Sequence, residues 1–481
     1  MGSPIETLIR DTVTKGIDAV AGFNRRRMAA RDGDNPFLTG IHTPMDREIT
    51  LGELAVTGTI PPGLDGRYLR IGPNPVAADP ASYHWFTGDG MVHGLAIADG
   101  KALWYRNRWI RSNAVAAARG VEPAPGPRHD FDTVNTNVMA IGGRTFALIE
   151  AGSYPVELGE TLEEQAYNPF DGTLKGSFTA HPHRDPRTGD HHAICYEGRD
   201  PGTIRHVVID ATGQVVREQP IAVRHGPMIH DCAITGRYVV ILDLPVTFSM
   251  KTLLAGHSFP YRWNPDHAAR VGLMPRDGVQ EDIVWCPVRP GFAFHVANAY
   301  DDADGRVVID LCAYDTMFGD GAQGPDARCR GLERWTLDPA SGMVEVSIID
   351  AAAQEFPRID ERFFGQPHRH VWTMALPGDP QDRFVGATQL YAHDVLTGTR
   401  QVHDFGPGRH PGEFVFIPET ADSAEGEGWL IGYVVDMAQE ATDLVILDAR
   451  RFDSPPVASI RLPHRVPPGF HGNWIANGAF Q

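Results

Sequence analysis

The sequence predicts an all-β fold in which many short antiparallel hairpins follow one another along the chain. Three observations support this prediction. Turn residues recur between short runs rich in Val, Ile, Leu, Thr and Tyr. The 51 glycines and 38 prolines are scattered singly between these runs. After about residue 50, no long helical pattern alternates with strands, which disfavours a doubly wound parallel sheet.

The clearest hairpins lie in the first third of the chain. Leu95–Ala98 leads through Asp99-Gly100 into Ala102–Tyr105, and a second pair of strands turns at Gly142-Gly143. Asp-Gly and Gly-Gly pairs readily take the positive φ angles that two-residue hairpin turns need. Further turns of this kind are Thr188-Gly189-Asp190, Thr212-Gly213, Asp304-Gly305, Ser341-Gly342 and Thr397-Gly398.

Hairpins that continue over more than 400 residues would leave exposed strand edges unless the sheets close on themselves. A β-propeller closes radially and suits this length, and a pair of β-sandwiches is the alternative. No blade-by-blade sequence repeat is present, so the pattern alone does not give the number of blades. No linker divides the chain, and we expect residues 31–481 to form a single domain.

Residues 1–30 have a helical pattern instead. Their apolar residues recur at intervals of three and four: Ile5, Leu8, Ile9, Val13, Ile17 and Val20. Arg25, Arg26 and Arg27 follow. We therefore expect an N-terminal amphipathic helix or arm. It either rests on a membrane surface or packs its apolar stripe against the protein itself.

The charge and cysteine content exclude several classes of protein. A formal net charge of −18 argues against a nucleic-acid partner. Five cysteines without a CxxC pair argue against a disulfide framework and a structural zinc site, and predict a reduced, cytoplasmic setting. No apolar run is long enough for a transmembrane helix, and the first residues lack the features of a secretion signal. Peripheral contact with a membrane stays open.

Four of the 21 histidines lie in unusual settings. They are His181 in HPHRDP, His230 in GPMIHD, His295 in GFAFHV and His471 in GFHGNW. The gaps of 49, 65 and 176 residues between them match no local metal motif. They do fit ligands that come one apiece from different strands of a closed sheet. From spacing alone, a metal site and four structural histidines both remain open.

These settings resemble the four iron-binding motifs of the carotenoid cleavage oxygenase family, in the same order along the chain. The family patterns are His-Pro-x-x-Asp-Pro, Met-x-His-Asp, Phe-His-x-x-Asn-Ala and Phe-His-Gly-x-Trp. Here they are matched by His181–Pro186, Met228–Asp231, Phe294–Ala299 and Phe470–Trp474. The resemblance runs from about residue 45 to the end and includes Gly66–Pro75, Phe86–His93 and Thr442–Ala449.

The resemblance implies a seven-bladed β-propeller with iron(II) on its axis and a cap of loops and short helices over one face. The metal ligands it implies are His181, His230, His295 and His471. Three glutamates that hold such histidines fall by motif on Glu150, Glu355 and Glu413, and Thr136 falls near an open metal position.

Each of these further residues also has a plain structural interpretation. A surface carboxylate at a strand end is the alternative for each glutamate. It applies most to Glu413, which could interact with its neighbours Arg409 and His410 in solvent. A simple turn is the alternative for Thr136. His183 stands where the family commonly has lysine, and we expect no metal role for it.

The implied activity is that of a non-haem iron(II) dioxygenase, which adds both atoms of O2 across a conjugated C=C bond and gives two carbonyl products. Four neutral imidazoles leave two positions of an octahedron open. Stilbene-cleaving relatives tend to have a lysine for the phenol and a Lys-Glu pair where this chain has Ile149-Glu150. We therefore expect a carotenoid or apocarotenoid substrate, with a stilbene such as resveratrol or lignostilbene as the alternative.

Two further questions stay open at this point. The apolar segment Val246–Trp263 forms either a tunnel mouth that touches lipid or a buried loop over the propeller face. A propeller that binds an apolar ligand without catalysis is the alternative from another functional class. The presence of all four histidines and all three glutamates argues against it. A zinc- or calcium-dependent hydrolase fits a four-histidine set poorly.

Overall fold

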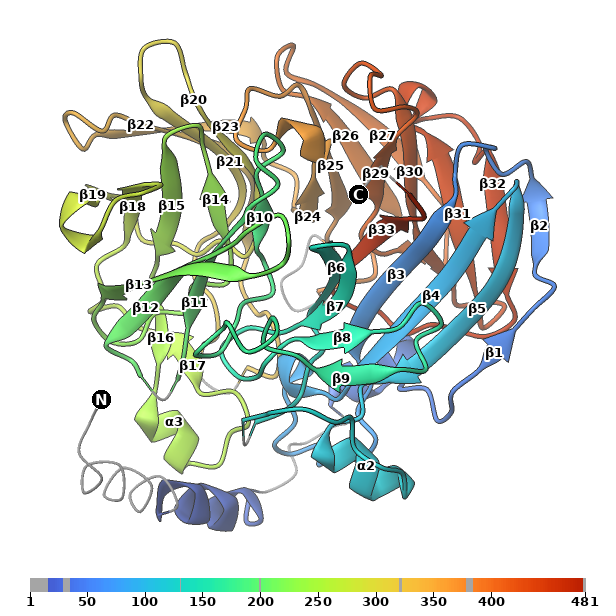
Figure 1. Ribbon diagram of the computed structural model, residues 1–481, viewed down its shortest axis with the longest axis horizontal. Helices are drawn as coiled ribbons and strands as arrows, with labels where there is room; N and C mark the ends of the chain where they lie inside the picture. The colour runs from blue at the N-terminus through green and yellow to red at the C-terminus, as the bar shows by residue number, and fades with distance from the viewer. Residues whose placement is uncertain are drawn as a thin grey trace.

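Short strands joined by tight turns pair with their neighbours in the chain, so successive stretches each build an antiparallel sheet. In this computed structural model, residues 16–28, 35–129, 131–198, 200–319, 322–377 and 384–478 are described. Their strands form seven sheets of four or more strands, arranged as a ring around a central axis (Figure 1). The expected all-β, seven-bladed propeller is confirmed.

Five blades each use one continuous stretch of chain. From the inner to the outer strand, one blade contains β6 (Asn137–Ile141), β7 (Arg144–Leu148), β8 (Val156–Leu158) and β9 (Gln165–Tyr167), and the next contains β10 (His183–Arg184), β11 (His191–Tyr196), β12 (Thr203–Ile209) and β13 (Val215–Ala222). The third contains β14 (Cys232–Ile234), β15 (Tyr238–Asp243), β18 (Arg270–Pro275) and β19 (Val284–Pro287), and the fourth contains β20 (Val296–Asp301), β21 (Val307–Tyr314), β22 (Cys329–Leu337) and β23 (Val344–Asp350). The fifth contains β24 (Gln354–Arg358), β25 (His370–Ala375), β26 (Gln389–Asp394) and β27 (Thr399–Asp404).

Both ends of the chain close the ring. The first blade contains β33 (Gly472–Ala476), β3 (Gly66–Pro73), β4 (Gly90–Ala98), β5 (Lys101–Trp109) and β1 (Thr50–Leu51). The last blade contains β28 (Arg409–Pro411), β29 (Val415–Pro418), β30 (Gly428–Asp436), β31 (Ala441–Asp448), β32 (Ala458–Leu462) and β2 (Ala55–Gly58). The C-terminal β33 therefore pairs with β3, and the early β2 completes the last blade, which ties the ends together.

The predicted hairpin turns are present. Asp99 and Gly100, with φ angles of 51° and 68°, join β4 to β5. Gly142 and Gly143, with φ angles of 58° and 73°, join β6 to β7. A Cβ atom on Gly142 would lie 2.6 Å from the backbone of Gly213 at the tip of the next blade. Glycine is therefore required there both for the turn and for the approach of two blades.

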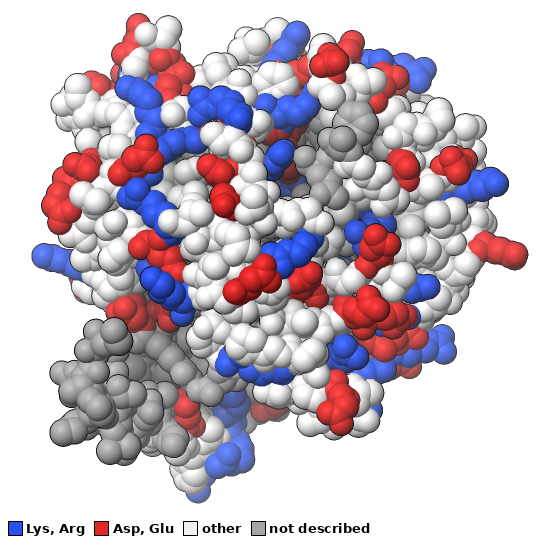
Figure 2. All heavy atoms as spheres, in the orientation of Figure 1, with Lys and Arg blue, Asp and Glu red and all other residues white. Residues whose placement is uncertain are grey.

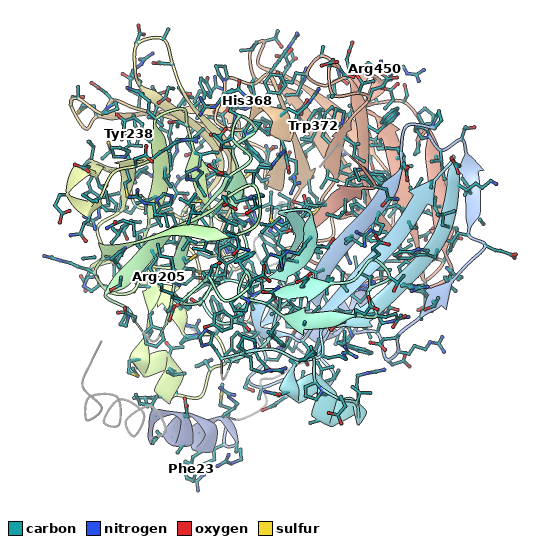
Figure 3. The ribbon with its side chains drawn as sticks, in the orientation of Figure 1. Phe23, Arg205, Tyr238, His368, Trp372 and Arg450 are labelled. Atoms are coloured by element: carbon teal, nitrogen blue, oxygen red, sulfur yellow. The ribbon has the colours of Figure 1, made fainter. Side chains whose placement is uncertain are left out.

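Strands inside the ring are buried on both faces, because each blade packs between two others. β21 shows this: all eight of its residues, from Val307 to Tyr314, are buried. Its one charged residue, Asp310, accepts two hydrogen bonds of 2.7 Å from Arg334 on the adjacent strand. Pairing offsets the cost of burying that carboxylate. Side chains fill the spaces between the sheets (Figure 3).

The helices within the described ranges are few and short. They are η1 (Pro36–Leu38), η2 (Gly40–His42), η3 (Trp85–Thr87), η4 (Gln280–Asp282), η5 (Glu361–Phe363), η6 (Ala449–Arg451), α2 (Asn113–Arg119) and α3 (Met250–Leu254). α3 lies between the strands of a two-stranded ribbon, β16 (Val246–Phe248) and β17 (Tyr261–Trp263). Residues 16–25 are also helical and lie with α2 and α3 along the lower edge of Figure 1. None of the described helices is long and apolar enough to cross a membrane.

The N-terminal helix has features of both interpretations drawn from its sequence. Ile5, Leu8, Ile9 and Val13 lie outside the described residues. Of the other two residues of the predicted stripe, Ile17 is half-buried and Val20 is 47% exposed. Outside the stripe, Ala21 is buried and Phe23 is 46% exposed. One face of this helix thus packs on the propeller and another faces solvent. The expected extent of the arm, residues 1–30, stays a prediction.

The contact between blades at Gly142 gives a test of the fold. Gly142→Ala should lower the free energy of unfolding by about 2–4 kcal/mol, because a left-handed residue is strained and the new Cβ displaces Gly213. Gly398→Ala is the matched control. Its φ angle is 69°, and no atom of the described residues lies within 4 Å of the point that its Cβ would occupy, so only strain of about 1 kcal/mol is expected. Thermal unfolding compares the two, and equal losses would contradict this packing.

Candidate metal centre

The four histidines singled out in the sequence meet at the axis of the ring. Each one lies one or two residues before the innermost strand of its blade: β10, β14, β20 and β33. Because inner strands converge on the axis, residues far apart in the chain come together there. One ring nitrogen of each of His181, His230, His295 and His471 lies within 4.8 Å of the others.

The four rings are buried and closely spaced. His230 Nε2 and His295 Nε2 are 3.1 Å apart. The ring of His181 has its centroid 4.6 Å from those of His230 and His471. Two nitrogens at about 2.1 Å from one metal ion and at right angles to each other would be about 3 Å apart. The spacing is therefore suitable for adjacent ligands of a single ion.

Each predicted glutamate contacts the Nδ1 atom of one histidine. Glu150 Oε1 lies 2.8 Å from His230 Nδ1, and Glu355 Oε2 lies 2.6 Å from His295 Nδ1. Glu413 Oε1 lies 3.0 Å from the Nδ1 atom of His471. With Nδ1 donating to a carboxylate, the ring presents the lone pair of Nε2 to the axis. The three carboxylates thus select the ring form that can bind a metal.

The surface interpretation of Glu413 is wrong. Its side chain is buried, and its second oxygen accepts a hydrogen bond of 2.9 Å from Gly472 N. Arg409 and His410 turn elsewhere, since Arg409 pairs with Asp443 at 2.7 Å. Burial raises the pKa of the Glu413 carboxyl, but His471 and Arg358 outweigh burial and bring the pKa down to about 2. Glu413 is therefore a buried carboxylate and not a solvated one.

The remaining polar atoms of the centre fit a bound cation. His181 Nε2 is buried and has no hydrogen-bond partner among the described residues. Burial and the neighbouring imidazoles hold the pKa of His181 well below its ordinary value, so this ring is neutral. If both Nδ1 atoms donate to their glutamates and both rings are neutral, the Nε2 lone pairs of His230 and His295 face each other at 3.1 Å, where one cation would bind both. Imidazole is a good ligand for iron, zinc and copper.

Thr136 lies beside this centre. It is buried and lines the cavity described below, and its backbone oxygen accepts from His471 N at 3.1 Å. Its hydroxyl donates to Asn135 Oδ1 at 2.9 Å, which is a local contact of the kind expected for a simple turn. Thr136 thus lies next to His471 and also makes the local hydrogen bond of a simple turn, so features of both interpretations are present.

His183 makes a different contact. Its Nε2 atom lies 2.7 Å from Asp231 Oδ1, which is outside the four-histidine group. The other oxygen of Asp231 accepts from Val296 N at 2.8 Å. Asp231 therefore joins three chain segments that each carry one of the central histidines. Sequence reasoning did not identify this role, although Asp231 lies in the same motif as His230.

A cavity of about 490 Å³ leads from the centre toward the surface. Eleven aromatic side chains line it, and those of Phe86, Phe294 and Phe356 lie close to the histidines. No lysine or arginine is among the lining residues in the described part of the chain. Such a site is suited to a long apolar molecule with little polar character.

Two helical segments, α3 and residues 16–25, contribute to the wall of this cavity. Met250 and Leu253 of α3 line it together with Ile17 of the N-terminal helix. The segment Val246–Trp263 thus contributes to the cavity wall, as one of its two interpretations expected, and Met250 is 43% exposed. Two hydrogen bonds, from Asn24 to Leu254 O at 2.7 Å and from Arg25 to Gly256 O at 2.9 Å, hold the helices together.

Two further residues of the centre were not predicted. Tyr196 donates a hydrogen bond of 2.7 Å to Glu150 Oε2, and Arg358 lies 3.4 Å from Glu413 Oε1. Tyr196 ends a strand of ordinary composition, and no motif marks it. Arg358 stands three residues after Glu355, but its contact with another glutamate depends on how neighbouring blades pack.

Removal of one of these carboxylates tests the geometry. Glu355→Ala should weaken the binding of iron(II) about 10- to 100-fold, because His295 loses the partner that fixes its ring. Glu345→Ala, on the exposed side of β23, is the control and should bind normally. Competition against a coloured chelator under argon measures both. Equal affinities for the two variants would show that Glu355 does not orient a ligand.

Comparison with known proteins agrees with this geometry. The family model described as retinal pigment epithelial membrane protein (RPE65) matches residues 42–476. A carotenoid cleavage oxygenase of Mycobacterium tuberculosis is 42% identical over 92% of this chain and 98% of its own. The crystal structure of Pseudomonas brassicacearum lignostilbene dioxygenase superimposes with a TM-score of 0.81 at 28% identity, over 92% of this chain and 98% of that one.

A second solved structure, the cobalt-substituted ACO of Synechocystis, has a TM-score of 0.80 and 26% identity, and the match covers 90% of this chain and 97% of that one. Family model, sequence relative and structures thus match over nearly the same part of the chain. That part contains all four histidines and all three glutamates. The chain therefore belongs to the carotenoid cleavage oxygenase family, which is the family that the retinal pigment epithelial membrane protein (RPE65) model describes.

Proposed function

We propose that this protein is an iron(II)-dependent dioxygenase that cleaves a conjugated C=C bond of a carotenoid or apocarotenoid with O2 and releases two carbonyl products. One observation carries the proposal: a long aromatic cavity ends at a buried group of four histidines. Membership of an oxygenase family supports the reaction class. The apolar cavity supports a substrate made mainly of hydrocarbon.

In this proposal His181, His230, His295 and His471 hold iron(II). Glu150, Glu355 and Glu413 hold three of these rings in the orientation that presents Nε2. When bound, iron supplies the redox chemistry that allows dioxygen to react with an alkene. The ligand set itself contains no carboxylate. The three glutamates, which are hydrogen-bonded to the ligating histidines, would therefore balance part of the metal charge without contacting the metal.

The protein's own contribution is to position the substrate and exclude water. Phe294 and Phe356 pack against His230 and His295, with ring centroids 5.2 Å apart in both cases. A polyene that fills the cavity is thereby held in one plane beside the centre, which replaces a bimolecular encounter by a fixed geometry. Thr136 lies on the same wall and limits the space next to His471.

The cavity also favours a polyene over a phenolic stilbene. Among the described residues, no lysine or arginine lines it, so no cation is placed to bind a phenolate. Ile149 occupies the position before Glu150 and adds a further apolar side chain. The solved lignostilbene dioxygenase has a similar fold, so stilbene cleavage is the second candidate, and the enzymatic test includes it.

The cavity mouth is suited to peripheral contact with a membrane, where apolar substrates dissolve. Met250 lines the cavity and is 43% exposed, and Val20 and Phe23 are 47% and 46% exposed on the same helix as the lining residue Ile17. Figure 3 shows Phe23 at the outer side of this helix. The Arg27 guanidinium lies 4.1 Å from the centroid of the Phe23 ring, and the exposed Lys251 follows Met250, so basic and apolar side chains occur together as in helices that rest on anionic lipid. On the face drawn in Figure 2, by contrast, acidic and basic residues are interspersed.

The five cysteines support the reduced setting that the sequence predicts. Cys195, Cys232, Cys286, Cys312 and Cys329 are all buried, and none forms a disulfide. Burial raises the pKa of the Cys195 thiol to about 12, so the unreactive thiol form predominates. The fold therefore does not depend on an oxidising compartment.

The activity test uses protein loaded with iron(II) under argon and then exposed to air with an apocarotenal or with resveratrol. The expected result is cleavage of the apocarotenal to two carbonyl products, identified by chromatography and mass, and its loss in His295→Ala. Glu164→Gln, at an exposed position, should keep full activity. Cleavage of resveratrol alone would overturn the substrate class. No product from either substrate, with one iron bound per chain, would overturn the proposed reaction.

Membrane contact is tested by sedimentation with phosphatidylcholine vesicles that contain an anionic lipid. The double variant Val20→Asp and Phe23→Asp should reduce the bound fraction several-fold, because burial of two apolar side chains is lost and negative charge is added. The control places aspartate at Val346 and Ile348, which are at least as exposed but lie on the outer strand β23. If both double variants bind like the unaltered protein, the mouth does not contact lipid.

A further inference from the structure

The three glutamates of the centre differ in what holds their carboxylates. Glu413 accepts a hydrogen bond from the backbone N–H of Gly472, and Glu355 accepts one from the backbone N–H of Phe356. Glu150 instead accepts a hydrogen bond of 2.7 Å from the Tyr196 hydroxyl. Main-chain N–H groups thus hold Glu355 and Glu413, with the Arg358 side chain also 3.4 Å from Glu413, whereas Glu150 is held by the side chain of Tyr196.

That side chain belongs to the cavity wall. Tyr196 ends β11, its ring is almost fully buried, and it lines the cavity that receives the proposed substrate. Its hydroxyl reaches Glu150, which follows β7 in one neighbouring blade, and Glu150 reaches His230, which precedes β14 in the other neighbouring blade. A continuous path of two hydrogen bonds therefore joins the substrate cavity to one central histidine.

The same tyrosine also contacts the outer part of the cavity. Its ring meets the edge of Tyr261 at a centroid distance of 5.7 Å and an interplanar angle of 87°. Tyr261 belongs to β17, the strand that follows α3 at the cavity mouth. Tyr261 and Tyr196 both line the cavity, so a molecule that fills it contacts this pair of rings.

We propose that Tyr196 is a positioning residue that couples occupation of the substrate cavity to the orientation of the His230 ring, through the carboxylate of Glu150. An apolar molecule packed on the tyrosine ring restricts its movement and so holds the hydroxyl on Glu150. With the cavity filled, Glu150 and His230 take one arrangement, and with it empty they have more freedom. This inference rests on the iron centre of the proposed function.

The phenol group is required in this position because a carboxylate needs a donor there. The Glu150 side chain is only 11% exposed. Without the hydroxyl, its second oxygen loses a charge-assisted hydrogen bond, and the carboxylate is free to turn away from His230. Glu355 and Glu413 would be unaffected, because their main-chain donors remain.

The experiment compares iron(II)-loaded wild type with Tyr196→Phe. Tyr105→Phe is the matched control, since it removes the hydroxyl of a buried tyrosine that lies outside the cavity lining and leaves the hydrogen bond between Tyr196 and Glu150 in place. Nitric oxide is added under argon as a spectroscopic probe of the iron, with and without an apocarotenal. Electron paramagnetic resonance then reports the symmetry of the ligand set in the absence of turnover.

The coupling predicts that apocarotenal changes the spectrum of wild type and of Tyr105→Phe but leaves that of Tyr196→Phe unchanged. Tyr196→Phe should also bind iron(II) roughly tenfold more weakly, as expected for loss of a contact outside the ligand sphere. A spectral change and an affinity of Tyr196→Phe like those of Tyr105→Phe would overturn the inference, whatever the effect on thermal stability.

A second variant covers the case in which Tyr196→Phe does not fold. Glu150→Gln keeps the size of the side chain, but it removes the charge and replaces one acceptor by an N–H group. The spectral response to apocarotenal should be lost, and its persistence would overturn the coupling. Failure of wild type to bind one iron(II) per chain would overturn the proposed function itself, whereas normal binding with an unaltered Tyr196→Phe response contradicts only this inference.

Discussion

Convergence of four imidazoles on one axis is the constraint on which the rest of this structure depends. Each ring lies directly before an innermost strand, so its position is set by the ring of blades as a whole. His471 shows the dependence most clearly. It precedes β33, the strand from the end of the chain that completes the first blade beside β3. The strand pairing that closes the ring of blades therefore also brings His471 into the centre.

The centre explains why three carboxylates are buried inside the protein. Glu150, Glu355 and Glu413 would each be costly inside the protein without a compensating charge. Each contacts a histidine, and Glu413 also has Arg358 nearby. A divalent cation among the four rings would supply the remaining positive charge. The same cation would also bind the Nε2 atoms of His230 and His295, which lie 3.1 Å apart, and would thereby stabilise the centre.

Much of this arrangement is predictable from the sequence, for identifiable reasons. Glycine pairs mark the hairpins because few other residues accept positive φ angles, and Gly142-Gly143 is an example. The histidine motifs predicted the group of four because their order along the chain resembles that of a known family. The placement of Glu413 was open, since a strand-end glutamate next to Arg409 is equally compatible with a solvated position.

Other features depend on how blades meet, which local sequence does not encode. Tyr196 and Glu150 lie in adjacent blades, and nothing near either residue in the sequence indicates that they touch. Asp231 links segments from three blades by contacts that only the closed ring creates. The cavity is likewise a product of side chains from distant parts of the chain. Patterns thus indicate which residues matter, and packing decides which of them act together.

The central claim is that one iron ion is bound by four imidazoles and by no carboxylate. X-ray absorption at the iron edge, on protein loaded with one equivalent of iron(II) under argon, tests it most directly. The account predicts a nitrogen shell with the outer-shell scattering of about four imidazole rings. A shell with fewer imidazoles and a carboxylate oxygen from Glu150, Glu355 or Glu413 would contradict it.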